Sequence, residues 1–200
     1  MLNTKHYALL NELAEKHGIV IFGGSEDLDI PIGELKQAFE IHSNIYNRSV
    51  SKLSIHTAIN VYDRYVMPLM PETLLLHIGN ADLDFFQEDP TTFDLKYRKF
   101  ISHIRSQNES CRIAIISLKN YENDSKISEM NKHLKYIAES EFCEYSDISN
   151  KRVWNPKGTK DAVSFVYSTG FMHPLKNNHP LYDLIKIFFN CACAEWVNNL

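Results

Sequence analysis

A serine stands where the sequence predicts the end of a buried strand. Residues 19–27 read Ile-Val-Ile-Phe-Gly-Gly-Ser-Glu-Asp, so four apolar residues run into two glycines and Ser25. This pattern is typical of a parallel strand that ends at a tight loop and lifts a side chain above the sheet. Ser25 is therefore the first candidate for chemistry. An incidental serine is the plain alternative, because strand ends in any α/β protein need small residues.

A serine becomes a useful nucleophile when a base takes its proton, and histidine is the usual base. His173 lies in a loop directly before the last predicted helix, and Pro174 would fix the backbone beside it. His179 follows at the start of that helix. Each of these histidines, taken alone, also fits a structural role. His77 lies inside a predicted strand and is expected to be buried structure.

Helices and buried strands alternate along the chain. The predicted strands, which are apolar runs bounded by glycine, proline or polar residues, are 19–22, 45–50, 73–78, 112–118 and 142–145. The predicted helices, which carry apolar residues at helical spacing, are 5–17, 35–39, 54–69, 94–106, 126–140 and 181–196. This alternation indicates an α/β fold with a mainly parallel sheet.

The residues that follow the strands are the ones expected to meet. In an open parallel sheet, ligands bind beyond the carboxyl ends of the strands. The segments at those ends are Ser25, 47–52, 79–84 and the loop that carries His173. We therefore expect these segments to converge on one site.

Length and composition exclude several classes of protein. Two hundred residues suit a single domain over 1–200. The formal net charge of −4 offers no basic surface for a phosphate backbone, so nucleic acid is not an expected partner. The longest apolar run contains Lys186 and Asn190, and acids interrupt the N-terminal segment, so neither a membrane span nor a secretion signal is expected. A cytoplasmic protein that does not contact a membrane is the resulting expectation.

Cysteines and glycines give little support for a cofactor. The four cysteines, Cys111, Cys143, Cys191 and Cys193, contain no C-x-x-C pair and are expected to be free, mostly buried thiols, with metal binding as a minor alternative. The glycines before Ser25 lack the spacing of a phosphate-binding loop, so a nucleotide or flavin binder is the least favoured interpretation. No cofactor and no metal are predicted.

Four short motifs occur in an order that resembles the SGNH, or GDSL-type, serine hydrolases. They are Phe-Gly-Gly-Ser, Tyr-Asn-Arg-Ser-Val-Ser, His-Ile-Gly-Asn-Ala-Asp-Leu and Gly-Phe-Met-His-Pro. The first three follow predicted strands, the fourth precedes the last predicted helix, and together they span nearly the whole chain. The resemblance implies a three-layer α/β/α sandwich with a mainly parallel, flavodoxin-like sheet. It also implies ester hydrolysis through an acyl-enzyme.

The resemblance assigns roles to five residues. Ser25 stands at the family's nucleophile and His173 at its base. The oxyanion hole is expected to contain Gly24, Ser49 and Asn80, which would supply backbone and side-chain donors. Gly24 replaces the aspartate of the family's Gly-Asp-Ser motif.

Other positions also depart from the family pattern. Gly170 replaces the aspartate of Asp-x-x-His, which orients the histidine in the family. Ser49 and Lys52 stand where the family commonly has glycine, and the oxyanion asparagine aligns with Ala81, one residue after Asn80. The carboxylates whose position could let them hold the His173 ring instead are Glu26, Asp27, Asp82, Asp84 and Asp161.

The leading hypothesis is a serine esterase that cleaves a small acyl ester, for instance an acetylated sugar, through Ser25 and His173. The partner is then a small-molecule or carbohydrate ester. Because the usual acid is missing, the alternative is a pseudoenzyme that keeps the fold as a binding or assembly module. The sequence defines neither the acyl group, nor the alcohol, nor the oligomeric state.

Overall fold

The computed structural model describes residues 5–38, 42–120 and 123–149. Its helices are α1 (Lys5–Leu13), α2 (Ile32–Ala38), α3 (Ala58–Tyr65), α4 (Leu83–Glu88), α5 (Pro90–Gln107) and α6 (Ser125–Ser140). Its strands are β1 (Ile19–Gly23), β2 (Ile45–Asn47), β3 (Thr73–His77), β4 (Arg112–Ile116) and β5 (Glu144–Ser146). Short 3-10 turns are η1 (Ser25–Asp27), η2 (Met67–Leu69) and η3 (Asn80–Asp82). The predicted helix 181–196 lies outside the described residues.

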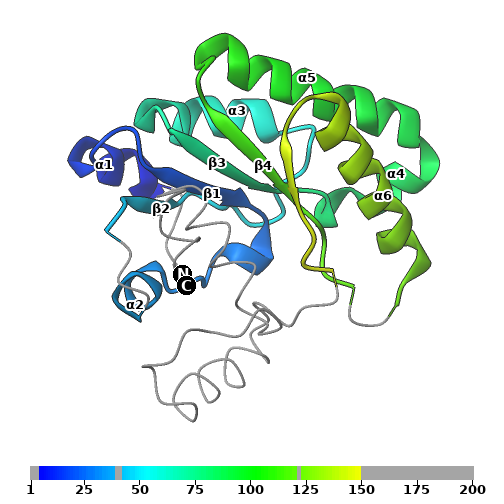
Figure 1. The fold of residues 1–200 in the computed structure, drawn as a ribbon, viewed down its shortest axis with the longest axis horizontal. Coiled ribbons are helices and arrows are strands. Elements are labelled where there is room, and N and C mark those ends of the chain that lie inside the picture. Colours follow the sequence, from blue (N-terminus) through cyan, green and yellow to red (C-terminus); the bar gives the residue numbers. More distant parts are fainter. Residues whose placement is uncertain (1–4, 39–41, 121–122, 150–200) are drawn as a thin grey trace, which may run out of the picture.

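The five strands form one sheet in the order β2-β1-β3-β4-β5, and every neighbouring pair is parallel (Figure 1). The predicted α/β class with a mainly parallel sheet is confirmed. The chain runs from β1 to β2 on one side and then crosses to β3 on the other side of β1. This reversal makes the carboxyl ends of β1 and β3 the switch point of the sheet, where Gly23 pairs with His77.

Both faces of the central strands are buried, which explains why their sequences are apolar runs instead of alternating patterns. Val20, Leu74 and Ile113 belong to one core cluster with residues of α3, α5 and α6. On the opposite face, Ile21 and Leu75 are at most 2% exposed. In Figure 1, α3, α4, α5 and α6 lie on one side of the sheet and α2 on the other, so helices flank both faces.

Three of the predicted boundaries are shifted in the structure. The helix expected from residue 54 begins at Ala58, because residues 54–57 form a separate turn in which the Thr57 amide donates to the Ser54 carbonyl at 3.0 Å. The Ile55 amide in this turn donates to the buried carboxylate of Asp82. The last described strand begins at Glu144 and not at Phe142, whose φ of 53° belongs to a turn after α6. Residues 14–17, predicted as helix, lie outside α1, which ends at Leu13.

The helix α5 is longer than predicted because Pro90 begins it. Proline lacks only an amide that the first turn leaves unpaired, so it suits the first helical position. Asp89 caps the helix, since its carboxylate accepts a hydrogen bond from the Thr92 amide at 2.9 Å. The segment before it, α4, was not predicted.

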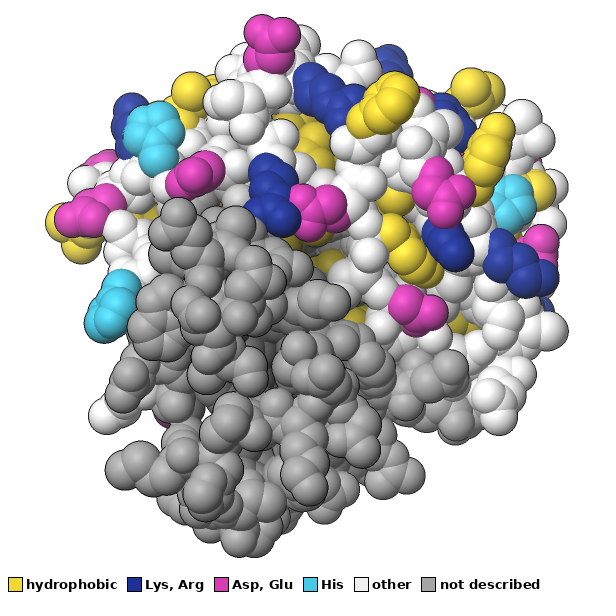
Figure 2. All heavy atoms as spheres, viewed as in Figure 1, with side chains coloured by type: hydrophobic (Ala, Val, Ile, Leu, Met, Phe, Trp, Pro, Cys, Tyr) yellow, Lys and Arg dark blue, Asp and Glu magenta, His cyan; other side chains and the backbone are white. Residues whose placement is uncertain are grey.

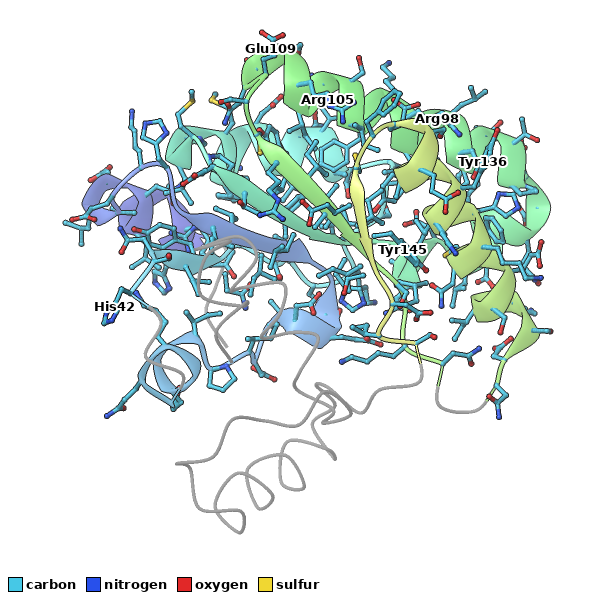
Figure 3. The ribbon with its side chains drawn as sticks, viewed as in Figure 1. His42, Arg98, Arg105, Glu109, Tyr136 and Tyr145 are labelled. Atoms are coloured by element: carbon cyan, nitrogen blue, oxygen red, sulfur yellow. The ribbon has the colours of Figure 1, made fainter. Side chains whose placement is uncertain are left out.

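Arginines of α5 join this helix to the end of α6 (Figure 3). Arg98 donates to the Glu141 carboxylate and lies over the ring of Tyr136, with 5.4 Å between the guanidinium carbon and the ring centroid. Arg105 donates to the Glu141 carbonyl. On the face drawn in Figure 2, acidic and basic side chains of the described residues are interspersed.

Candidate active site

The carboxyl ends of β1 and β3 bring two predicted site segments together. The turn η1 follows β1 and begins with Ser25, while η3 follows β3 and begins with Asn80. The two strands pair along their whole length, from Ile19 opposite Thr73 to Gly23 opposite His77. Both turns therefore start at the same edge of the sheet, at the position where open parallel sheets bind ligands.

Ser25 is exposed, and its hydroxyl points toward the loop after β2. Its Oγ accepts a hydrogen bond from the Lys52 amide at 3.0 Å and lies 3.3 Å from the Ser51 Oγ. A backbone donor beside a nucleophile oxygen can also reach the oxygen of a bound ester carbonyl. The geometry thus combines an accessible hydroxyl with a fixed hydrogen-bond donor.

The two glycines before Ser25 have different roles. A Cβ on Gly23 would lie 1.9 Å from the Asp27 Oδ2, so only glycine leaves room for that carboxylate. A Cβ on Gly24 would meet no atom within 4 Å, and the Gly24 φ of −89° suits any residue. Gly23 is therefore required for packing, whereas Gly24 has space for a side chain.

The loop after β2 supplies a donor from Lys52 and not from Ser49. Ser49 is fully buried: its Oγ accepts from the Gly23 amide at 3.1 Å, and its own amide donates to the Asn47 Oδ1 at 2.9 Å. The Tyr7 hydroxyl of α1 donates to the Ser49 carbonyl at 2.9 Å. These contacts hold the loop against the end of β1. Lys52 has a φ of 56°, the left-handed conformation that glycine adopts at lowest cost.

Asn80 begins the second turn. Gly79 before it has a φ of 145°, and the Asp82 amide donates to the Gly79 carbonyl at 2.8 Å. Asp82 is 1% exposed, and both of its carboxylate oxygens accept from the Ile55 amide, at 3.1 and 3.0 Å. Burial raises the pKa of Asp82 to about 6, although this hydrogen bond opposes the rise.

Four charged or titratable side chains gather around the Asp27–His77 contact at the end of the turn that carries Ser25. The carboxylate of Asp27 lies 2.9 and 3.0 Å from the His77 Nδ1, and both residues are buried. Burial alone would lower the pKa of His77, but the charge and hydrogen bond of Asp27 and the charge of Glu26 raise it above its ordinary value. Lys119 Nζ lies 3.8 Å from Glu26 Oε2, and burial lowers the pKa of this lysine.

Comparison of the sequence with known proteins gives no assignment. No family model matches the chain, and no curated protein matches it.

Solved structures give a clear match to the fold. A GDSL-like lipase from Bacteroides thetaiotaomicron is similar with a TM-score of 0.60 and 16% identity, over 94% of this chain and 95% of that one. An acetylxylan esterase from Geobacillus stearothermophilus has a TM-score of 0.56 and 14% identity, over 91% of this chain and 97% of that one. The chain has the fold of the GDSL-type hydrolases. The fold predicted from the ordered motifs is confirmed.

Several residues that the GDSL-type motifs point to lie outside the described residues. These are His173, the predicted base, together with Pro174, His179, Gly170 and Asp161. Of the other carboxylates considered as partners for the histidine, Asp27 contacts His77 and Asp82 contacts the Ile55 amide. Glu26 contacts Lys119, and Asp84 is exposed on α4.

Other predicted properties can be compared with the described part of the chain. Cys111 and Cys143 are free thiols, and burial raises the pKa of Cys111 to about 12 and that of Cys143 to about 11. Within residues 5–38, 42–120 and 123–149, no three histidine, cysteine or acidic side chains are arranged to hold a metal ion. None of the helices in these ranges is long and apolar enough to cross a bilayer.

Sequence reasoning missed three parts of the site. It considered Asp27 as a partner for His173 or as a loop acid and treated His77 as buried structure, so the pairing of Asp27 with His77 was not expected. It placed Ser49 in the oxyanion hole, whereas the amide beside the Ser25 Oγ belongs to Lys52. The supporting role of Tyr7 was also not expected. Of these parts, Lys52 could have been found from the sequence, because it stands where the family commonly has glycine.

Proposed function

We propose that this chain is a serine ester hydrolase in which Ser25 attacks the ester carbonyl and His173 is the base. The observation that carries the proposal is the placement of Ser25. Its exposed hydroxyl stands at the switch point of a GDSL-type fold, 3.0 Å from a backbone donor in the loop after β2. Clefts at such switch points are the usual ligand sites of open α/β sheets.

In the proposed reaction, the Ser25 Oγ bonds to the carbonyl carbon while His173 takes the hydroxyl proton. The carbonyl oxygen becomes an oxyanion, which the Gly24 amide, the Asn80 side chain and the Lys52 amide would stabilise. Collapse of this intermediate releases the alcohol, which receives the proton from His173. Water then attacks the acyl-enzyme by the same steps and frees the acid.

The roles of two of the five predicted site residues, Ser49 and His173, rest on different grounds from those of the others. Ser49 was expected as an oxyanion donor, and we now assign it to the support of the strand ends because its amide and hydroxyl are both used there. His173 keeps its assignment from the motif resemblance alone. The solved structures of this fold include an acetylxylan esterase, which supports an O-acetylated carbohydrate as the substrate class.

The test compares Ser25→Ala with Ser51→Ala, a matched control whose hydroxyl lies 3.3 Å from that of Ser25. Turnover of p-nitrophenyl acetate should fall by at least roughly 10³-fold in Ser25→Ala, because the nucleophile is lost, and change little in Ser51→Ala. A fluorophosphonate probe should label the wild type at Ser25 and fail to label Ser25→Ala. Undiminished turnover in Ser25→Ala would remove Ser25 from the role. Absence of labelling together with a ligand-induced rise in melting temperature would favour the pseudoenzyme.

A further inference from the structure

We propose that the buried Asp27–His77 pair is a positioning pair for the nucleophile turn. It ties the turn that carries Ser25 to the end of β3 and so fixes the Ser25 hydroxyl beside the Lys52 amide. This inference rests on the proposed function, because it takes Ser25 as the reacting residue.

The pair closes the turn on the β3 side. Asp27 ends η1, and its amide donates to the Gly24 carbonyl at 3.2 Å, so Ser25 lies inside the closed turn. Both carboxylate oxygens of Asp27 lie within 3.0 Å of the His77 Nδ1. Asp27 is 5% exposed and His77 is 4% exposed, so water does not weaken this contact.

The fold makes room for the carboxylate. A Cβ on Gly23 would lie 1.9 Å from the Asp27 Oδ2 and 3.0 Å from the His77 carbonyl. The last residue of β1 must therefore be glycine for Asp27 to reach the neighbouring strand. The end of β1, the turn η1 and the His77 imidazole therefore pack together as one unit.

A second contact holds the same turn on the β2 side. The Asn47 Nδ2 donates to the Asp27 carbonyl at 2.6 Å, while the Asn47 Oδ1 accepts from the Ser49 amide. Asp27 thus joins β3 through its side chain and β2 through its main chain. Among the described residues, the contacts of the Ser25 hydroxyl come from Ser51 and Lys52 in the loop after β2, so Asp27 is what links the turn to β3 there.

The stabilisation of the turn by the Asp27–His77 pair depends on pH, because it depends on the charges of the groups involved. The groups that face His77 are Asp27 and Glu26 from η1 and Lys119 after β4. With His77 protonated, two carboxylates face two cations. When His77 loses its proton, the Asp27 carboxylate loses its cationic partner, which is costly because both residues are buried. The pair therefore holds the turn below the pKa of His77 in the folded protein, and this stabilisation is lost as the pH rises through that pKa.

The first experiment measures the position of the turn without using activity. Hydrogen exchange of the Lys52 amide in the full chain should become roughly tenfold faster in Asp27→Ala and His77→Gln, because the Ser25 Oγ no longer accepts its hydrogen bond. Asp94→Ala is the matched control: Asp94 lies 3.0 Å from the His133 Nδ1 in a similar pair between α5 and α6. Equal protection of Lys52 in wild type, Asp27→Ala and Asp94→Ala would overturn the proposal.

The second experiment measures the reaction. We expect kcat/KM for p-nitrophenyl acetate to fall roughly 10²-fold in Asp27→Ala, the size expected when a reacting group is displaced by about 1 Å. In Asp27→Asn, His77 loses the charge that holds its proton, so the decline in rate at high pH should begin at a lower pH than in the wild type. A pH profile of Asp27→Asn that superimposes on the wild-type profile would overturn the proposal, as would equal rates in Asp27→Ala.

The two hypotheses fail in different ways. Full activity in Ser25→Ala would remove Ser25 as the nucleophile, whereas the exchange rate of the Lys52 amide would still decide whether Asp27 and His77 position the turn. Conversely, a loss of activity in Ser25→Ala with an unchanged Lys52 exchange rate in Asp27→Ala would keep the hydrolase and remove the positioning pair.

Discussion

The turns after β1 and β3 share one plan and differ in their anchors. Gly24-Ser25-Glu26-Asp27 and Gly79-Asn80-Ala81-Asp82 each close by a hydrogen bond from the last amide to the glycine carbonyl, at 3.2 and 2.8 Å. Each places a polar residue directly after the glycine and buries the aspartate at its end. In each turn, therefore, the polar residue after the glycine lies at the site, and the buried aspartate holds the turn in place.

The anchors of the two aspartates behave differently with pH. Asp27 contacts an imidazole, which titrates, while Asp82 contacts a backbone amide, which does not. Asp82 itself titrates near pH 6 because it is buried. The first turn therefore responds to pH through the imidazole that Asp27 contacts, and the second through the Asp82 carboxyl group itself, so the two turns lose stability in separate ranges of pH.

The largest effect is expected from Asn80, the half-buried residue that begins the second turn. Asn80→Ala should lower kcat for an acetyl ester by roughly 10²–10³-fold, the usual cost of removing one oxyanion donor. Ala81→Asn is the companion variant, because Ala81 aligns with the family's asparagine. If Asn80→Ala keeps the wild-type rate and Ala81→Asn raises it, Asn80 is not the donor.

Asp82→Asn should remove a dependence of stability on pH. The folded protein keeps the Asp82 proton up to about pH 6, whereas the unfolded chain releases it near 3.8, so the native state binds more protons between these values and the wild type loses stability as the pH rises. The shift corresponds to about 3 kcal/mol across that window. Urea unfolding at pH 4 and pH 7 should show a flatter dependence in Asp82→Asn. An unchanged dependence would mean that Asp82 is ionised throughout.

The two glycines of the first turn should respond differently to alanine. Gly23→Ala forces the Asp27 carboxylate to move and should lower the free energy of unfolding by about 1–3 kcal/mol, as overpacking does. Gly24→Ala meets open space and should change it by less than about 0.5 kcal/mol, as do most substitutions away from packed sites. Chemical denaturation of both variants measures the difference. Similar losses in both would contradict the packing role of Gly23.

The smallest effect is expected at Lys52. A non-glycine residue in the left-handed conformation costs about 1–2 kcal/mol, and Lys52→Gly removes this cost but adds freedom to the unfolded chain. Stability should therefore change by less than about 1 kcal/mol, and the rate should stay within roughly twofold because the amide donor remains. Lys52→Ala is the control for the side chain. A loss of rate in both variants would show that the ammonium group, not the amide, acts at the site.

Much of the fold could be predicted because its signals are local. Apolar runs that end at Gly23 and Gly79 marked β1 and β3, and their order with the helices indicated a parallel sheet. The start of α3 could not be predicted, since the residues before it form a separate turn whose Ile55 amide donates to Asp82, which is far away in the sequence. Tertiary contacts of this kind leave no periodic pattern.

The positions of Ser25 and Asn80 were predictable, because each directly follows the glycine that comes after a buried strand run. The Asp27–His77 contact was not predictable, since it requires the order of the strands, which places Gly23 beside His77. The donor from Lys52 is a backbone amide, and side-chain types do not reveal which amide faces Ser25. The order of the motifs therefore located the candidate site at the strand ends, and the structure added the contacts between its residues.

The open space beside Gly24 bears on how this chain relates to its structural neighbours in evolution. Two of the four glycine codons become an aspartate codon by one base change, and the space at Gly24 accepts a Cβ without rearrangement. The Gly-Asp-Ser motif therefore lies one amino-acid substitution away. A lineage could lose or regain that aspartate while the turn around Ser25 kept its shape.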